Sequence, residues 1–259
     1  MTLEEAIAKI KPLDHNAMEI AQKRWDSIAK PLHSLGKLET LLTQVAGITG
    51  NADIDLSKRG LVAMCADNGV VEEGVTQTGQ EVTAIVAENF LRYDTSVGVM
   101  CKQNHAEIFP VDMGMVTDTK VRTDHKVAYG TQNMTKGPAM TREQAIKGIE
   151  AGIAMVEELK NKGYKILATG EMGIGNTTTS SAVASVLLEQ PVEEMTGRGA
   201  GLTSEGLVRK IAAIRKAIEL NQPDPSDAID VLAKVGGLDI AGMAGVFLGG
   251  AVYHVPVIM

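Results

Sequence analysis

The segment from Tyr164 to Val186 constrains the fold more than any other part of the sequence. It opens with a short apolar stretch, Tyr164 to Ala168, which follows Gly163 and is typical of a buried strand. It closes with small residues from Thr177 to Val186, which suit a helix that Asn176 or Thr177 could cap. Between the two lies a turn that contains three glycines and one acid: Gly170, Glu171, Gly173 and Gly175. A strand, a glycine-rich turn and a helix in this order predict one βα unit of an α/β sheet.

Such a turn can also hold an anion. Main-chain N–H groups at the start of a helix and the positive end of the helix dipole both favour a phosphate there. Glycine lets the backbone approach a ligand closely and adopt positive φ. A βα turn that binds nothing gives the same pattern, but such a turn has no use for the carboxylate of Glu171. The turn has neither the Gly-Lys-Ser/Thr of a Walker loop nor the G-x-G-x-x-G spacing of a dinucleotide site.

Two further buried strands are predicted upstream. Gly60 to Ala66 is apolar and leads into Asp67, and Ala106 to Val111 leads into Asp112. Open α/β sheets bind ligands at the carboxyl ends of their strands, so Asp67 is a candidate ligand residue. It is equally typical of a surface turn, because Asp-Asn-Gly is a common turn sequence. With a last strand near 253–258, we expect strands at 61–66, 106–111, 164–169 and 253–258.

The composition fits one large α/β domain with a helical appendage. Hydrophobic residues make up 44% of the 259 residues and aromatic residues only 3%, so the core must be aliphatic, with 13 Met as adaptable filler. Apolar residues recur at helical spacing through the first 50 residues and are interrupted by Pro12 and Pro31. We therefore expect a helical lobe over residues 1–55 and an α/β domain over 56–259.

Several classes of protein are disfavoured. A net charge of −7 and the lack of a basic, aromatic-interleaved stretch argue against nucleic-acid binding. No apolar run reaches the length of a membrane span. Cys65 and Cys101 are far apart and lack metal-ligand spacing, so we expect buried thiols and a cytoplasmic protein. We expect no metal and no cofactor.

Five glycine-rich or polar motifs share their order and spacing with a known family: Ala66–Val70 (ADNGV), Gln80–Thr83 (QEVT), Gly170–Thr178 (GEMGIGNTT), Gly197–Gly201 (GRGAG) and Gly236–Gly245 (GGLDIAGMAG). On these motifs the chain resembles the nicotinate-nucleotide:dimethylbenzimidazole phosphoribosyltransferases, which build the lower-ligand nucleotide of cobamides. The resemblance runs from about Pro31 to the last residue. Together with the strand pattern, it implies a three-layer, mainly parallel Rossmann-like sheet with a small helical N-terminal lobe.

The resemblance also implies a reaction. Ribose 5-phosphate would move from nicotinate mononucleotide to 5,6-dimethylbenzimidazole, or to a related base or phenol, to give an α-ribazole-type 5′-phosphate and nicotinate. The residues expected to bind substrate are Gly173, Gly175, Asn176, Thr177, Thr178, Gly199, Lys210, Asp67 and Gln80. A helical lysine is ordinarily exposed to solvent, but the family's lysine at the position of Lys210 contacts the phosphate. We assign Glu171 to catalysis, through ribose binding or charge stabilisation, with general base as its weaker alternative.

Some features depart from the family pattern. Ile85 and Val86 stand where the family usually has Gln and Met, so the identity of the acceptor stays open. In the family the chain continues beyond the strand expected at 253–258 and there carries a glutamate as general base. The resemblance thus leaves open a shortened form, an incomplete chain or a subunit that relies on a partner. We expect a homodimer, with a heterodimer of related chains as the variant. The alternatives to an active enzyme are a non-catalytic partner subunit and a generic phosphosugar- or nucleotide-binding module.

Overall fold

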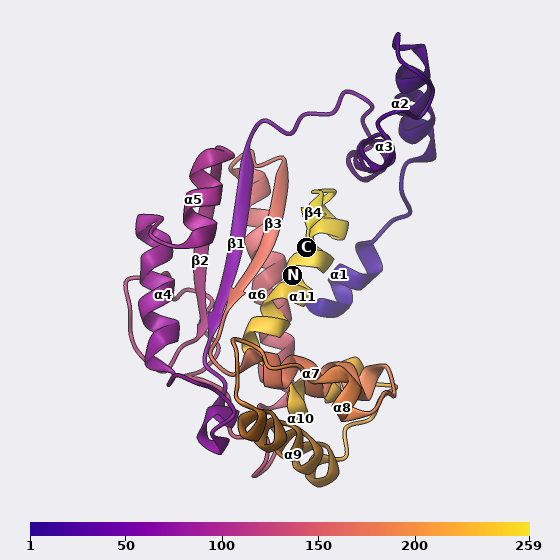
Figure 1. The fold of residues 1–259 in the computed structure, drawn as a ribbon. Helices are drawn as coiled ribbons and strands as arrows, with labels where there is room; N and C mark the ends of the chain where they lie inside the picture. The colour runs from indigo at the N-terminus through magenta and orange to yellow at the C-terminus, as the bar shows by residue number, and fades with distance from the viewer.

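Four parallel strands, in the order β2–β1–β3–β4, form the centre of the computed structural model, which describes residues 1–259 (Figure 1). The strands are β1 (Arg59–Ala66), β2 (Ala106–Gly114), β3 (Ile166–Met172) and β4 (Val257–Ile258). β1 is hydrogen-bonded to β2 on one side and to β3 on the other, whereas β4 pairs only with Leu167 and Ala168 of β3. Parallel strands need crossover connections, and helices supply them here. The predicted α/β fold class is confirmed.

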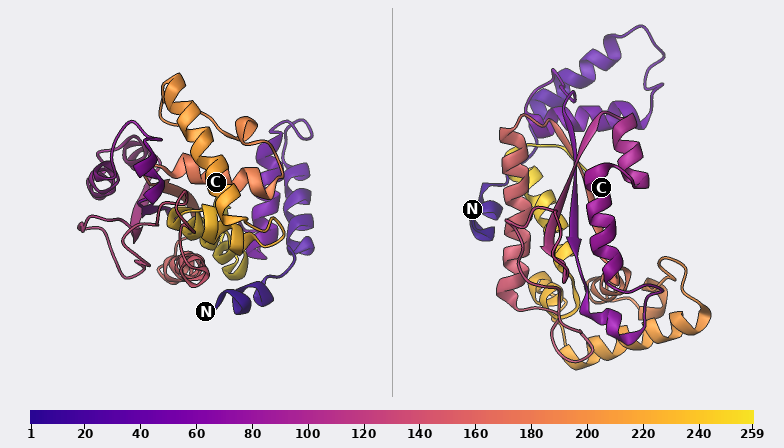
Figure 2. Two further views of the ribbon diagram at one scale, coloured as in Figure 1. Left: turned by 90° about the horizontal axis from the view of Figure 1, so that it is seen from below. Right: turned by 90° about the vertical axis from the view of Figure 1, so that its left-hand side faces the viewer.

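Helices cover both faces of this sheet (Figure 2). α4 (Glu81–Arg92) and α5 (Ser96–Gln103) lie on one face, and α6 (Arg142–Asn161) and α11 (Leu238–Tyr253) form the layer on the other. Side chains of β1 alternate between the two layers: Val62 and Met64 belong to the core under α6 and α11, whereas Ala63 and Cys65 pack on the α4 side. A strand covered on both faces needs apolar residues at every position, which explains the unbroken apolar run in β1.

The last predicted strand is shorter than expected. Tyr253 is the final residue of α11, and His254 follows it in the left-handed conformation at φ 57°, so only Val257 and Ile258 join the sheet. The central strand also differs, because β3 begins two residues later than predicted and extends through Glu171 to Met172. Glu171 therefore lies at the end of a strand rather than inside the turn.

A second group of helices closes the carboxyl end of the sheet, at the bottom of Figure 1. It comprises η1 (Gly69–Glu73), α7 (Asn176–Leu187), α8 (Val192–Met195), α9 (Ser204–Asn221) and α10 (Ala228–Val235). These elements share their own apolar cluster, to which Val70, Ala182, Ile214 and Val231 contribute. The turn between β3 and α7 thus lies between this cluster and the apolar core of the sheet.

The N-terminal helices divide into two sets. α1 (Leu3–Lys9) packs on α6 and α11, and its Leu3 N–H donates to Glu150 Oε1 at 2.9 Å. α2 (His15–Ser27) and α3 (Lys37–Thr49) pack on each other, away from α7–α10 (Figure 1). The division of the chain at residue 55 stays a prediction. None of the helices is both long enough and apolar enough to cross a membrane.

Candidate active site

The turn between β3 and α7 has a geometry that only glycine allows. Gly175 is the residue before α7 and has φ 94°, in the left-handed region. A Cβ on Gly175 would lie 2.8 Å from Val71 Cγ2, and one on Gly173 would lie 2.4 Å from Ala66 O. The turn is therefore pressed against the carboxyl end of β1, and neither glycine can carry a side chain without a shift of its neighbours.

Several main-chain N–H groups of this turn have no acceptor within the protein. The amides of Gly175 and Thr177 donate to no other group of the chain, whereas Asn176 N–H donates to Gly173 O at 3.0 Å. The helix dipole of α7 adds its positive end at the same place. A cavity of about 120 Å³ lies at this turn, lined by residues 173–177, by the loop 75–78, and by Arg198, Ala200 and Leu202. The loop 75–78 and the turn 197–201 contact each other at the edge of the cavity, where Gln77 Nε2 donates to Gly201 O.

Lys210 lies directly behind this cavity and is only 1% exposed. Its Nζ donates to Thr177 Oγ1 at 2.7 Å and to Gly197 O at 3.1 Å. No carboxylate pairs with it, and burial lowers its pKa. The second glycine-rich turn packs over it, because Gly199 has φ 56° and a Cβ there would lie 2.7 Å from Thr177 Oγ1.

A layer of buried polar side chains lies beneath the turn. Asp67, Asn68 and Asp239 are all fully buried. Asp67 Oδ2 accepts the Val116 N–H at 2.8 Å, and Asp239 Oδ1 accepts the Ile240 N–H at 2.9 Å. Burial raises the pKa of both carboxyls, that of Asp239 to about 6, and these hydrogen bonds oppose the shift. Asn68 Nδ2 donates to Asp239 Oδ2 at 3.4 Å and so links the end of β1 to the start of α11.

Glu171 is solvent accessible at the end of β3, and Asn176 Nδ2 donates to its carboxylate. Many protein atoms nonetheless surround the carboxyl group. They raise its pKa to about 7, with the charge of Asp239 as the second cause. A carboxyl group with this pKa can take up or release a proton near neutral pH.

Comparison with known proteins identifies the family. A family model described as "Phosphoribosyltransferase" matches residues 10–259. Nicotinate-nucleotide–dimethylbenzimidazole phosphoribosyltransferase from Ruminiclostridium cellulolyticum is 53% identical over 261 residues, covering 100% of this chain and 74% of its own length. The enzyme of that name from Clostridium tetani is 48% identical, covering 99% and 72%. The crystal structure of CobT from Thermus thermophilus matches with a TM-score of 0.86 at 34% identity, covering 93% of this chain and 73% of that one.

The chain belongs to the nicotinate-nucleotide–dimethylbenzimidazole phosphoribosyltransferase family. It spans about three quarters of the length of the relatives it matches. The resemblance predicted from the motifs is confirmed.

The structure gathers most of the predicted site residues of this phosphoribosyltransferase around one turn: Glu171, Gly173, Gly175, Asn176, Thr177, Gly199 and Lys210. Gln80 lies at the edge, where its Nε2 donates to Asn68 O at 3.2 Å. Asp67 and Thr178 lie beneath the turn with both side chains buried, at 0% exposure. Their assignment as substrate-binding residues stays a prediction.

Three residues of this site were missed in the sequence. Asn68 follows Asp67 at the end of a strand, Asp239 lies inside the motif Gly236–Gly245, and Arg198 lies inside Gly197–Gly201. An acid or amide within a glycine-rich run was the signal for the first two. Their contacts cross between segments about 170 residues apart, which no local pattern reveals.

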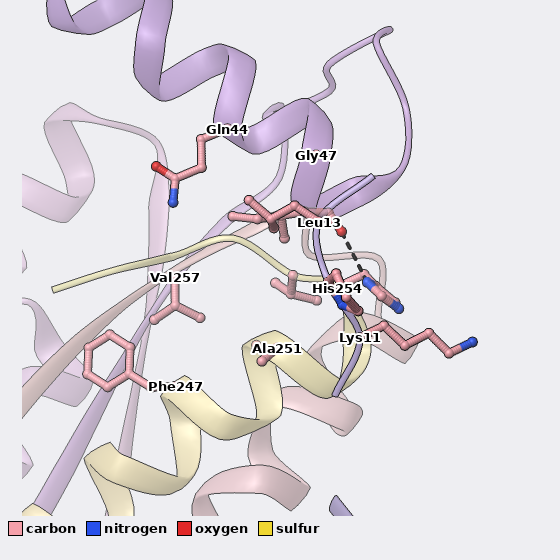
Figure 3. A pocket seen from close by; sticks show the side chains of 12 residues that line it. Lys11, Leu13, Gln44, Gly47, Phe247, Ala251, His254 and Val257 are labelled. Atoms are coloured by element: carbon pink, nitrogen blue, oxygen red, sulfur yellow. Dashed lines mark hydrogen bonds between the residues drawn. The ribbon is translucent and has the colours of Figure 1, made fainter. Parts of the chain in front are cut away.

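Other concave regions lie away from the turn. A cavity of about 250 Å³ separates α3 from the end of α11, where His254 Nδ1 donates to Ile48 O at 3.1 Å (Figure 3). A larger apolar one, of about 530 Å³, lies at the amino ends of the strands. One set of possible metal ligands, Asp124, His125 and Glu158, occurs where Arg122 already pairs with both carboxylates. The turn is preferred as the site because it alone combines unpaired donors, a buried cation and a carboxylate with a raised pKa.

Proposed function

We propose that this chain transfers ribose 5-phosphate from nicotinate mononucleotide to 5,6-dimethylbenzimidazole or a related base or phenol. The products would be an α-ribazole-type 5′-phosphate and nicotinate, for the lower ligand of a cobamide. Family membership supports the reaction class. The observation that carries the assignment of the site is Lys210, a buried cation without an anionic partner at the N-terminus of α7.

A phosphate group would complete this arrangement. A buried ammonium is costly unless it is paired, and Lys210 has only two neutral acceptors, Thr177 Oγ1 and Gly197 O. The unpaired N–H groups of Gly175 and Thr177 need acceptors as well. A phosphate monoester supplies both negative charge and acceptor oxygens at one point. We assign the 5′-phosphate of the nucleotide to this position.

With the phosphate fixed, the ribose of the donor would extend towards the end of β3. The bond between the anomeric carbon and the pyridinium nitrogen breaks, and its electron pair leaves with nicotinate. A benzimidazole nitrogen forms the new bond from the opposite face, which gives the α-nucleotide, and the N–H proton of the base passes to a carboxylate. We assign Glu171 to ribose binding or to stabilising the positive charge that develops on the ribose, with proton acceptance as its weaker alternative.

The remaining predicted residues would act around this centre. Gly173 lets the turn approach the end of β1, Gly199 lets the second turn approach Thr177, and Asn176 orients Glu171 through its side-chain hydrogen bond. Gln80 lies on the side where the acceptor would enter, next to α4. Asp67 and Thr178 support the turn from beneath.

The experiment is a turnover assay. The protein is incubated with nicotinate mononucleotide and either 5,6-dimethylbenzimidazole or a phenol. The products are then separated, and mass spectrometry identifies and quantifies them. We expect nicotinate and the α-nucleotide in equal amounts. Nicotinate riboside, which lacks the phosphate, should react far more slowly. Equal rates for the two donors would contradict the assignment of the turn to phosphate.

The assembly is also a proposal. We propose a two-fold homodimer, with a heterodimer of related chains as the variant. Support comes from a row of exposed apolar residues at the start of α3 and just before it: Ile28, Leu32, Leu35, Leu38 and Leu41. A cytoplasmic location stays a prediction that rests on the two unpaired, buried cysteines.

A further inference from the structure

The peptide group between Ile174 and Gly175 is held from inside the protein by Asn68. Asn68 Nδ2 donates to Ile174 O at 3.5 Å and to Asp239 Oδ2 at 3.4 Å. Both neighbours are acceptors, so the side-chain amide must present its nitrogen to them. Both distances are at the long end of the hydrogen-bond range. Their effect is therefore to favour one orientation of the peptide rather than to bind it tightly.

Thr83 holds the preceding peptide, between Gly173 and Ile174. This residue of α4 is fully buried, and its Oγ1 accepts the Ile174 N–H at 3.1 Å. The two polar atoms of Ile174 are thus both directed into the protein, one to Asn68 and one to Thr83.

The orientation of the Gly175 N–H follows from peptide geometry. In a trans peptide the C=O and the N–H point in opposite directions. Because Ile174 O points inward to Asn68, the Gly175 N–H in the same peptide points outward, where it has no partner in the protein. A flip of this peptide would instead present a carbonyl oxygen to the anion. Glycine at position 175 adopts the conformations on both sides of such a flip at little cost.

We propose that Asn68 and Thr83 are positioning residues that select the outward orientation of the Gly175 N–H and so form the phosphate site. The identity of the ligand rests on the proposed function. Neither side chain touches the phosphate. Asn68 also accepts the Gln80 side chain at its main-chain oxygen, so it contacts both the edge of the site and the turn.

The test compares donors with and without a phosphate. Asn68→Ala should raise KM for nicotinate mononucleotide roughly 10-fold, the size expected for one lost buried hydrogen bond, with a smaller change in kcat. Turnover of nicotinate riboside should change much less, so the preference for the phosphorylated donor should fall. Binding of inorganic phosphate, measured by calorimetry, should weaken by a similar factor.

Two further variants make the result decisive. Thr83→Val keeps the shape of the side chain and removes its hydroxyl, so it should act in the same direction and replaces Asn68→Ala should the latter not fold. Asn221→Ala is the matched control, because Asn221 is a buried asparagine that donates to Met134 O at 2.8 Å far from the turn. Equal losses for both donors, or no loss with either variant, would overturn the inference. A wild type that does not prefer the phosphorylated donor would instead overturn the proposed function.

Discussion

Lys210 is the residue whose environment is most unusual for its type. On the sequence it is a helical lysine, which is ordinarily exposed, yet here it is 1% exposed and unpaired. We expect Lys210→Ala to weaken binding of nicotinate mononucleotide by roughly 10- to 100-fold, because a charge-assisted hydrogen bond to the phosphate is lost. The fold should persist, since no carboxylate pairs with Lys210 and only two neutral acceptors, Thr177 Oγ1 and Gly197 O, lose a donor. Calorimetry measures the affinity, and Lys216→Ala, an exposed lysine on the same helix, is the control. Equal affinities for wild type and Lys210→Ala would count against the assignment.

Glu171 should give the reaction a pH dependence. Its pKa is raised to about 7, so the carboxylate form that could stabilise positive charge on the ribose is lost as the pH falls below 7. We expect kcat to fall as the pH decreases below 7, which gives the pH profile an acidic limb. Glu171→Gln should abolish this limb and lower kcat by ~10²-fold. Asp239→Asn should move the limb to lower pH, because the charge of Asp239 helps to raise the pKa of Glu171. Glu194→Gln, an exposed acid on α8, should leave the profile unchanged.

Asp239 should also make stability depend on pH. Its pKa is about 6 in the folded chain, above the ordinary value of 3.8, so the folded state binds the proton more tightly than the unfolded state. The ionisation of Asp239 therefore lowers the free energy of unfolding as the pH rises from about 4 to 6. Above pH 6 this loss reaches about 3 kcal/mol. Urea unfolding should show Asp239→Asn gaining stability relative to wild type between pH 4 and pH 8. The exposed Asp26→Asn serves as the control. A difference that does not change with pH would contradict this account.

At the scale of the elements, the sequence predicted the strands of the sheet but not all of their ends. β1 and β2 were readable because residues buried on both faces form continuous apolar runs. The boundary between α11 and β4 was not, because Tyr253 and Val255 suit a strand as well as a buried helix end, and His254 ends the helix with a positive φ that only the structure reveals. Likewise the turn after β3 was recognised from its glycines, whereas the supports from Asn68 and Asp239 depend on tertiary contacts.

The small residues of α11 also have a role that the sequence left ambiguous. They pack within the chain, against α6. A Cβ on Gly245 would lie 1.9 Å from Ile149 O of α6, and one on Gly152 of α6 would lie 2.1 Å from Gly242 O. The two helices therefore touch through their backbones, beneath the sheet that carries the site.

This contact predicts a severe effect of one added methyl group. Gly245→Ala must push α6 and α11 apart, and we expect a loss of about 3 kcal/mol in the free energy of unfolding. Gly137→Ala is the control: no atom lies within 4 Å of the position that its Cβ would take, and its φ is not positive, so stability should be unchanged or slightly higher. Urea unfolding compares both with wild type. A Gly245→Ala variant as stable as Gly137→Ala would show that the two helices can separate without cost.

At the scale of the whole molecule, the apolar row before and within α3 needs an explanation, because these side chains are exposed to solvent. Leu32, Leu35 and Leu41 are 66%, 47% and 57% exposed. Nearby, Lys30 pairs with Glu39 at 2.8 Å, and both side chains are almost buried, so the segment that carries the row is ordered. Several exposed large apolar side chains in one short segment are typical of an interface between chains.

The proposed dimer should therefore depend on this row. Light scattering of the wild type should give the mass of two chains over a wide range of concentrations. A Leu35→Glu, Leu41→Glu double variant would bury two carboxylates without partners in such an interface. Since each central anchor contributes ~2 kcal/mol or more, the loss of both should raise the dissociation constant of the double variant by roughly 10³-fold, and monomer should appear. Leu220→Glu changes a leucine of similar exposure, 53%, on α9 and should leave the dimer intact. A wild type that is monomeric throughout would refute the homodimer, and a double variant that stays dimeric would place the interface on another face.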